Sequence, residues 1–432
     1  MLDNLGWGWD NARAILGVGV IYLVAWGISE NRKSFPWKIV LGASGLQLAF
    51  ALLLYGLPPV KEGLSQASVV VNALQAATRA GTNFVFGYVG DNTAWTFSES
   101  APGPVFFFQI LPLVIVVASL SAILWHWRIL RWITKGFAFI FSRTMGLGGA
   151  TSLAVSANVF MGMTEAPVLI KPYLQRMTRS EVFIVMTAGF ATIAGSVMVI
   201  YITFLEPVMK DPLSQLLAAS LMAAPAAVAI ALTIVPEITD RTDRAHEPEF
   251  EYHSTMDAFA TGASDGMKIV LNIATMLIAA LALLYLVNAI LGAIPVGAIP
   301  GMGNEPLSLQ RILGWIFAPL MYMIGVPADE AQKAGSLMGV KTVLTEFVAF
   351  IDLSAVPMDE MSDRTRRIVA NAICGFANFG SVGILIGGLS IIAPEKRDLF
   401  LSLAWKTLLS GTLATCSSGA VIGLLPASLF AS

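Results

Sequence analysis

The sequence predicts an all-α polytopic membrane protein with about eight transmembrane helices and two oppositely oriented re-entrant hairpins joined to broken helices. Composition is the first reason, because 56% of the 432 residues are hydrophobic and only 12% are charged. Soluble domains carry about 25% charged residues. The apolar residues also form runs near ~20 residues, the length that crosses a bilayer core. A repeat within the chain predicts the hairpins.

Apolar runs predict the membrane spans, at residues 13–28, 39–57, 104–124, 182–204, 213–235, 267–292, 366–390 and 398–425. Cytoplasmic loops of membrane proteins carry an excess of Lys and Arg. The basic clusters between spans fall inside if both termini lie outside, except for Arg364, Arg366 and Arg367. We therefore expect a multi-pass protein in the lipid of the inner (plasma) membrane, with the N-terminus and C-terminus outside. Its first helix is expected to be retained and not cleaved as a signal peptide.

Other segments fit the membrane surface better than a span. Residues 125–141 interleave Trp with basic residues, which is typical of a helix at the lipid headgroups. Residues 307–324 follow a Gly- and Pro-rich loop and fit either an interfacial helix or a short span. The external loop 58–103 contains an Ala- and Val-rich stretch, 64–80, that is compatible with a surface helix.

The chain resembles itself in two places. Residues 164–197 and residues 345–382 both begin with Thr-Glu, pass through a polar loop containing Thr-Arg, and end in a span containing Gly-Phe-Ala. One copy begins at the cytoplasm and the other outside, so the repeat is inverted, as in many secondary transporters. Residues 146–170 and 328–351 are too polar and Gly-rich for spans, and we interpret them as re-entrant hairpins. Gly and Ser in the spans that follow predict helices that unwind. Unwound backbone is tolerated in a bilayer only where it lines a cavity or is buried in protein.

The repeat divides the chain into five parts. Each repeat is expected to contain a hairpin, a broken helix and a further helix, and the parts between them are scaffold. The parts are N-terminal helices and an external loop (1–103), a scaffold helix and interfacial helix (104–145), the first inverted repeat (146–235), a cytoplasmic loop, scaffold helix and external interfacial helix (236–327), and the second inverted repeat (328–432).

The two Thr-Glu pairs supply the main candidates for chemistry. An ionisable residue inside a membrane costs roughly 2.5–3.5 kcal/mol, so Glu165 and Glu346 are expected to face one central polar site. The alternative is that each glutamate caps a hairpin helix or pairs with a lysine such as Lys341. Asn378 and Ser381 lie three residues apart beside glycines, so they either present polar groups to the site or satisfy unwound backbone.

A small hard cation prefers carbonyl, amide and hydroxyl oxygens. Asn158 and Thr192 offer such groups near the hairpin and the broken span. There is no GxxxxGK[ST] loop, which argues against ATP as the energy source and leaves an ion gradient. The net charge of −2 argues against a nucleic-acid partner. Three alternatives stay open: a carrier of another small polar solute, a passive channel, and a membrane enzyme that uses the two glutamates as acid and base.

Several motifs resemble those of the concentrative nucleoside transporters. The motifs are GMTEAP (162–167), KPYLQRMTRSE (171–181), TAGFATIAGSV (187–197), TEFVAF (345–350) and CGFANFGSVGILIGG (374–388). The resemblance covers residues 104 to 425, and it implies a secondary active symporter that imports nucleosides with sodium. It also implies a homotrimer in which a domain of hairpins and broken helices moves like an elevator.

The resemblance implies roles for individual residues. Thr164 and Glu165 would contact the nucleobase beside the apolar Val197. Glu346, Asn378 and Ser381 would contact the ribose, with Phe376 nearby in the pocket. The sodium ligands would be the Asn158 side chain, the Thr192 hydroxyl and the Met161 and Ile193 carbonyls. Met163 stands where the family usually has Gln, which leaves the preferred base open and makes a purine or modified nucleoside possible. Proton coupling through a buried glutamate also stays open.

Overall fold

The computed structural model describes residues 7–90, 105–238, 252–294 and 306–430. These residues form helices and loops, and no strand occurs in the described part of the chain, which confirms the all-α class. Several helices are long and apolar enough to cross a membrane: Trp37–Gly56, Phe106–His126, Arg179–Leu205, Pro212–Ile234, Thr255–Gly292 and Pro394–Leu424. The first expected span is a single helix that is not apolar enough, and the segment expected at 366–390 is divided into two shorter helices.

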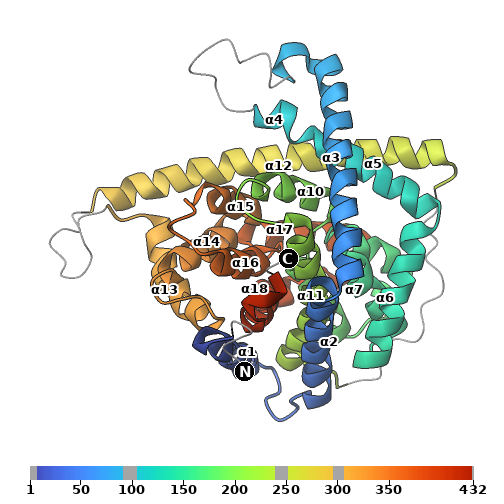
Figure 1. Ribbon diagram of the computed structural model, residues 1–432. Coiled ribbons are helices and arrows are strands. Elements are labelled where there is room, and N and C mark those ends of the chain that lie inside the picture. The colour runs from blue at the N-terminus through green and yellow to red at the C-terminus, as the bar shows by residue number, and fades with distance from the viewer. Residues whose placement is uncertain (1–6, 91–104, 239–251, 295–305, 431–432) are drawn as a thin grey trace.

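Figure 1 labels most of these helices in chain order. The N-terminal set is α1 (Trp9–Gly27), α2 (Trp37–Gly56), α3 (Pro58–Phe86), α4 (Phe106–Gln109), α5 (Pro112–His126) and α6 (Ile129–Met145). The middle set is α7 (Gly149–Asn158), η4 (Ala166–Ile170), α8 (Lys171–Leu174), α9 (Arg179–Ala191), α10 (Gly195–Leu205), α11 (Pro212–Ile234) and α12 (Thr255–Gly292). The C-terminal set is α13 (Leu309–Met323), α14 (Ala331–Val343), α15 (Glu346–Ala355), α16 (Asp363–Ile373), α17 (Phe379–Ile392) and α18 (Arg397–Leu424).

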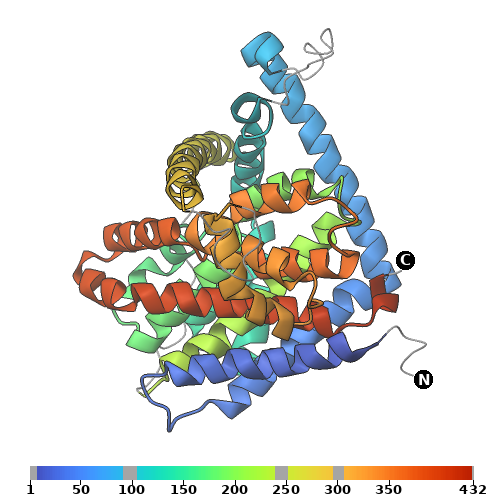
Figure 2. The same ribbon diagram turned by 90° about the vertical axis from the view of Figure 1, so that its left-hand side faces the viewer.

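The centre of the molecule is a bundle of α9, α11 and α18, which are almost completely buried. Alanine dominates α11, and such small side chains let helices approach closely where water provides no driving force between them. Around this bundle, α2 packs on α11, and both α1 and α16 pack on α18. The start of α1 lies beside the end of α18, because the Asn11 amide donates to the carbonyls of Gly423 (3.0 Å) and Leu425 (2.7 Å). The two ends of the chain therefore share one face (Figure 2).

The two hairpins are pairs of short helices with a tip between them. In the first, α7 leads to a tip at residues 159–165 and returns through η4 and α8; in the second, α14 turns directly into α15. A ten-residue helix such as α7 or α15 spans about 15 Å, half the thickness of a bilayer core. The hairpins at 146–170 and 328–351 thus have the form that the sequence predicts.

The two broken helices meet at their breaks. The first is interrupted between α9 and α10 at residues 192–194, and the second between α16 and α17 at residues 374–378. At Gly375, a Cβ atom would lie 2.8 Å from the Phe190 carbonyl oxygen and 2.9 Å from that of Ala191. Only glycine permits this contact. The unwound backbone of one repeat therefore rests directly on that of the other.

Helices α5 and α12 form an arm along one edge of the bundle, where α12 crosses the whole width of the molecule (Figure 1). Most residues of α12 are exposed or half-buried. The helix begins at Thr255, twelve residues before the expected start at 267, because Ser254 caps it by accepting from the Asp257 backbone N–H (3.1 Å).

Two further expectations at the N-terminal side need correction. The stretch 64–80 belongs to a longer helix, since α3 follows α2 almost directly and takes up most of the segment expected to be an external loop. Trp125 belongs to the end of α5, whereas the expected interfacial segment 125–141 becomes helical again as α6 only at Ile129. The separation occurs at Arg128, which has a left-handed backbone (φ 66°).

A polar cluster links the α1–α2 loop to the central bundle. The Glu30 carboxylate accepts from the Arg179 guanidinium (2.9 Å) and from the Lys406 ammonium (2.6 Å). The bond from Arg179 and the nearby Lys406 charge hold the pKa of Glu30 at about 2, well below its usual range. The α1–α2 loop is thus attached to α9 and α18 by an ionised carboxylate between two cations.

The three arginines that break the charge rule have structural partners. Arg366 is fully buried and donates to four carbonyls of the α15–α16 connection, among them those of Val356 (2.8 Å) and Pro357 (2.6 Å). Arg364 donates to the carbonyls of Gly325 and Gly423, and Arg367 lies over the Phe430 ring. These three arginines stabilise tertiary contacts inside the protein, which explains why they do not follow the rule that basic residues lie in cytoplasmic loops.

We predict that Arg366→Lys lowers the free energy of unfolding by about 3 kcal/mol, because a lysine cannot reach all four carbonyls and leaves buried acceptors unpaired. Thermal melting of the detergent-solubilised protein measures this. The matched control is Arg79→Lys on the exposed face of α3, which should melt like the parent. Equal melting of both variants would contradict a structural role for Arg366.

Candidate functional site

The tips of both hairpins and both broken helices surround one cavity of about 170 Å³. Every substrate-contact candidate from the sequence lines it: Met163, Thr164, Glu165, Val197, Glu346, Phe376, Asn378 and Ser381. The candidates come from α10, α15, α17, the first hairpin tip and the second break, which are far apart in sequence. The inverted repeat brings them together because its two copies enter from opposite sides.

Glu346 is the most constrained polar group of the cavity. It is the first residue of α15, where Thr345 caps the helix by accepting from the Val348 backbone N–H (3.3 Å). A carboxylate in the first turn is stabilised by the helix dipole. The Tyr201 hydroxyl donates to Glu346 Oε1 and the Asn378 amide donates to Oε2, both at 2.9 Å. The carboxylate is thus fixed by a residue from each broken helix.

Asn378 fills both of the roles that its sequence position leaves open. Its Oδ1 accepts from the Ser381 backbone N–H (2.8 Å), which caps α17 and satisfies backbone at the break. Its Nδ2 donates to Glu346. Because both ends of the amide are engaged, the Asn378 side chain has a defined orientation in the cavity, and Ser381 is held one turn along from it.

The first hairpin presents Met163, Thr164 and Glu165 from its tip. Glu165 Oε2 accepts from the Gly162 backbone N–H (3.2 Å), so this carboxylate helps to close the tip while lining the cavity, and its side chain does not cap the following helix η4. Met163 is 7% exposed and packs so closely on Gly189 that a Cβ there would lie 2.9 Å from its own Cβ.

Lys341 is not the partner of either glutamate. It is fully buried on α14, and its ammonium group lies 3.4 Å from the Thr415 hydroxyl of α18. No ion pair joins it to Glu165 or Glu346 among the described residues. The alternative in which a lysine neutralises the site through a direct pair is therefore wrong for this conformation.

Sequence reasoning missed Tyr201 and the contribution of α12. Tyr201 is fully buried and lies four residues after Val197, on the same face of α10, so helical spacing from a known candidate could have found it. Asn272 and Met276 of α12 also line the cavity. An asparagine in the middle of an apolar span is itself a signal for a functional position.

The cation candidates gather where the first hairpin tip touches the first break. The Gly195 backbone N–H donates to the Phe160 carbonyl (3.0 Å), and a Cβ at Gly189 would lie 3.7 Å from Asn158 Oδ1. Met161 and Ile193 flank this contact. Thr192 is buried and its hydroxyl donates to the Ala188 carbonyl (2.9 Å), which leaves the lone pairs of its oxygen available.

Asn158 provides the test of whether a cation fits there. Its side chain is completely buried, yet neither Oδ1 nor Nδ2 has a hydrogen-bond partner among the described residues. Buried polar atoms are nearly always paired, so an unpaired amide at this position fits a site for an ion. The described residues contain no cluster of three acidic, Cys or His side chains, so the available donors are neutral oxygens suited to a monovalent cation.

Two hairpins, two broken helices and a polar cavity shared between them are the architecture of many secondary transporters. Comparisons with known proteins agree. Three sequence profiles match: Na+ dependent nucleoside transporter N-terminus over residues 16–89, nucleoside recognition over 107–208, and Na+ dependent nucleoside transporter C-terminus over 215–423. The chain is 34% identical to the nucleoside permease NupC of Helicobacter pylori, over 95% of this chain and 97% of that protein.

A mammalian relative and solved structures also indicate a nucleoside transporter. Human sodium/nucleoside cotransporter 1 is 32% identical over 95% of this chain, which spans 63% of that longer protein. A solved structure of CNTnw, inward-facing and substrate-bound, aligns with a TM-score of 0.85 at 35% identity, over 96% of this chain and 98% of that one. A CNTnw variant in an outward-facing state aligns with a TM-score of 0.86 at 34% identity.

The chain belongs to the Na+-dependent, or concentrative, nucleoside transporter family. It is a multi-pass protein of the plasma membrane and a transporter, not an enzyme. The family implies sodium as the coupling ion. The resemblance drawn from the motifs is thereby confirmed.

Tyr201→Phe removes the hydroxyl that holds Glu346 while keeping the ring stacked on Phe350 (4.4 Å between centroids). A hydrogen bond to a charged group is worth more than a neutral one, so we predict a KM for nucleoside uptake raised about ten-fold. Radiolabelled uridine uptake measures it. Tyr55→Phe removes a buried hydroxyl bonded to Gln215 instead and should leave KM unchanged. An unaltered KM in Tyr201→Phe would show that the carboxylate keeps its position without this bond.

Proposed function

We propose that this protein imports nucleosides by sodium-coupled symport, in an elevator-like alternating-access cycle. The observation that supports this most is the shared tip of the first hairpin. Residues 159–165 connect the unpaired Asn158 amide to Met163, Thr164 and Glu165 in the substrate cavity. An ion that orders the tip at one end thereby prepares the substrate contacts at the other.

The cavity has two halves that suit the two halves of a nucleoside. Glu346, Asn378 and Ser381 form the polar half, where a fixed carboxylate can accept hydrogen bonds from sugar hydroxyls. The other half combines Thr164 and Glu165 with apolar groups, and it suits a flat base with polar edges. Its apolar groups include Val197, Phe376 and Met163. The Met163 thioether cannot donate a hydrogen bond, so base selection here rests on Thr164 and Glu165, and purines or modified bases remain within the substrate range.

An elevator motion needs a moving body and a fixed one. Glu346 and the contact at Gly375 join the second hairpin to both broken helices. The bond from the Gly195 N–H to the Phe160 carbonyl joins the first hairpin to the first break, so all four elements suit a unit that moves as a whole. Helices α5 and α12 pack mainly on each other, and α12 leaves large apolar side chains exposed, among them Leu271, Ile278 and Tyr285. These suit contact with lipid or with the same helix of neighbouring copies in a homotrimer.

The energy available matches the task. One sodium ion moving through 100 mV releases about 2.3 kcal/mol. A ten-fold sodium gradient adds about 1.4 kcal/mol. Together they can concentrate a neutral nucleoside on the order of several hundred-fold. With both termini on one face, the orientation that places them outside keeps most basic loops in the cytoplasm.

Glu346→Gln tests the ribose contact. The substitution keeps size but removes the charge that accepts sugar hydroxyls, and we predict loss of uptake of about 100-fold or more in a folded protein. Uptake of labelled uridine measures activity, and thermal melting checks folding. Glu181→Gln, in the capping box that begins α9, is the matched control and should transport normally. Near-normal transport by Glu346→Gln would refute the assigned role.

Asn158→Ala tests the cation site. Removing one oxygen ligand should raise the sodium concentration for half-maximal uptake about ten-fold without altering the order in which nucleosides compete. The readout is uridine uptake measured over a sodium series at constant ionic strength. Asn371→Ala removes another buried amide, one that bonds the Arg367 carbonyl (2.9 Å), and should leave the sodium dependence unchanged. An unchanged value in Asn158→Ala would mean that the cation binds elsewhere.

A further inference from the structure

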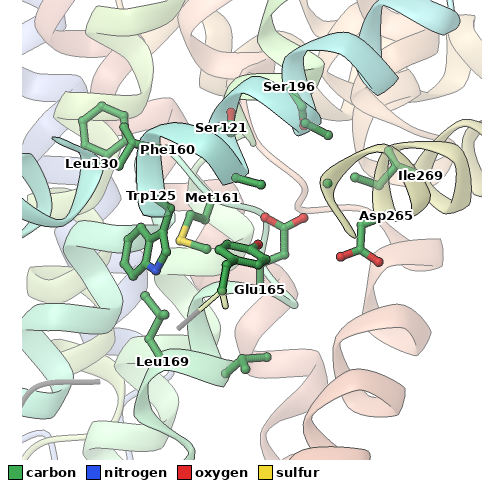
Figure 3. Close-up of a pocket in the computed structure, with 15 residues that line it drawn as sticks. Ser121, Trp125, Leu130, Phe160, Met161, Glu165, Leu169, Ser196, Asp265 and Ile269 are labelled. Atoms are coloured by element: carbon green, nitrogen blue, oxygen red, sulfur yellow. The ribbon is translucent and has the colours of Figure 1, made fainter. Parts of the chain in front are cut away.

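A second cavity, of about 240 Å³, adjoins the substrate cavity between the first hairpin and the arm of α5 and α12. Glu165 and Ile269 line both cavities, so the two spaces meet at the Glu165 carboxylate. Figure 3 shows Trp125 and Leu130 on one side of this second cavity, Asp265 on the opposite side, and Glu165 between them. The second cavity contains none of the ribose-contact candidates.

The arm forms a rigid wall of this cavity. Gly262 and Gly266 lie one turn apart on α12, and a Cβ at either would clash with α5, at 2.8 Å from the Ser119 Cα and 2.7 Å from the Ile115 Cα. Small residues at this spacing bring two membrane helices into backbone contact. Asp265, next to Gly266, therefore keeps its position while the hairpin on the other side of the cavity is free to be a separate body.

Trp125 offers the cavity an unused hydrogen-bond donor. It is only 3% exposed, and its indole N–H has no partner in the part of the chain that the structure describes. The Arg131 guanidinium lies over the ring at 5.5 Å from its centroid. An unpaired indole N–H at such depth is unusual and fits a position where a ligand supplies the acceptor.

Carboxylates, a hydroxyl and a second ring line the same cavity as Trp125. The Asp265 carboxylate accepts from the Lys268 ammonium on its own helix (2.8 Å) and is half-exposed, so its charge is partly neutralised. Glu165 supplies a second carboxylate, Ser121 a hydroxyl, and Tyr252 an aromatic ring. Donor, acceptors and flat apolar surface together suit a heteroaromatic base with a hydroxylated sugar.

We propose that this second cavity is a transit site that holds the nucleoside between the substrate cavity and the cytoplasm. Glu165 lines both cavities, so its carboxylate can keep a hydrogen bond to the base while the rest of the nucleoside moves from the substrate cavity into the second cavity. The proposal rests on nucleoside transport as the function. Its direction follows from charge: Trp125 lies at the end of α5, next to Arg128 in the α5–α6 connection and to α6, which carries Arg131 and Lys135, and basic clusters mark the cytoplasmic side.

The test compares the two faces of the membrane in the full-length protein. Labelled uridine transport is measured with right-side-out vesicles, which report the external KM, and with inside-out vesicles, which report the internal KM. Trp125→Phe keeps a ring but removes the N–H, and should raise the internal KM about five-fold while leaving the external KM unchanged. Asp265→Asn should also raise the internal KM, and because the Asp265 side chain is half-exposed, the substitution should leave folding intact.

Trp127→Phe is the matched control. It removes the indole N–H of a neighbouring tryptophan that bonds to Thr255 (3.2 Å) and does not line the cavity, so both KM values should stay at the parent level. If internal and external KM rise together in Trp125→Phe and Asp265→Asn, or if neither changes, the transit site is wrong. If the parent protein moves no uridine in either direction, nucleoside transport itself fails, and the transit site with it.

Discussion

A carboxylate kept deep inside a membrane protein must be held by partners, and Glu346 has one partner from each of the two broken helices. It begins α15, accepts from Tyr201 on α10, and accepts from Asn378 at the start of α17. Losing any one partner would leave a buried charge short of hydrogen bonds, which is costly. The second hairpin and both broken helices are therefore bound into one unit by the same group that is proposed to bind substrate.

Backbone contacts at two glycines also join the hairpins and the broken helices. Gly375 lets the second break rest on the carbonyls of Phe190 and Ala191, and Gly189 lets the first broken helix pack against Met163. Interrupted helices expose backbone that would be costly in lipid, and these contacts bury it inside protein. Because the breaks touch each other and the hairpin tips, the ion and substrate candidates share walls instead of occupying separate sites.

Much of this arrangement could be predicted from sequence, and the reasons are local. The Thr-Glu repeat, the glycines at the breaks and the apolar runs predicted the hairpins and the broken helices and pointed to Glu165, Glu346, Asn378 and Ser381. The family resemblance supplied the other four candidates that line the substrate cavity. Tyr201 escaped notice because its hydroxyl matters only once α10 lies beside α15, a long-range contact without a motif. The length of α3 and the early start of α12 were missed because their ends are only moderately apolar. Hydropathy detects apolar stretches that cross a membrane, and it does not detect helical residues that extend beyond them. The arginines at 364, 366 and 367 contradicted the charge rule because tertiary carbonyl contacts, invisible in sequence, hold them.

The most direct test of the account is whether sodium and nucleoside bind as coupled ligands of one hairpin tip. Coupling of this kind is reciprocal: if sodium tightens nucleoside binding, nucleoside tightens sodium binding by the same factor. Equilibrium binding of labelled uridine to the purified protein should therefore strengthen about ten-fold or more when sodium replaces potassium at constant ionic strength. A uridine Kd that is identical in the two salts would show that the tip does not connect the ion to the substrate, and would contradict the central claim.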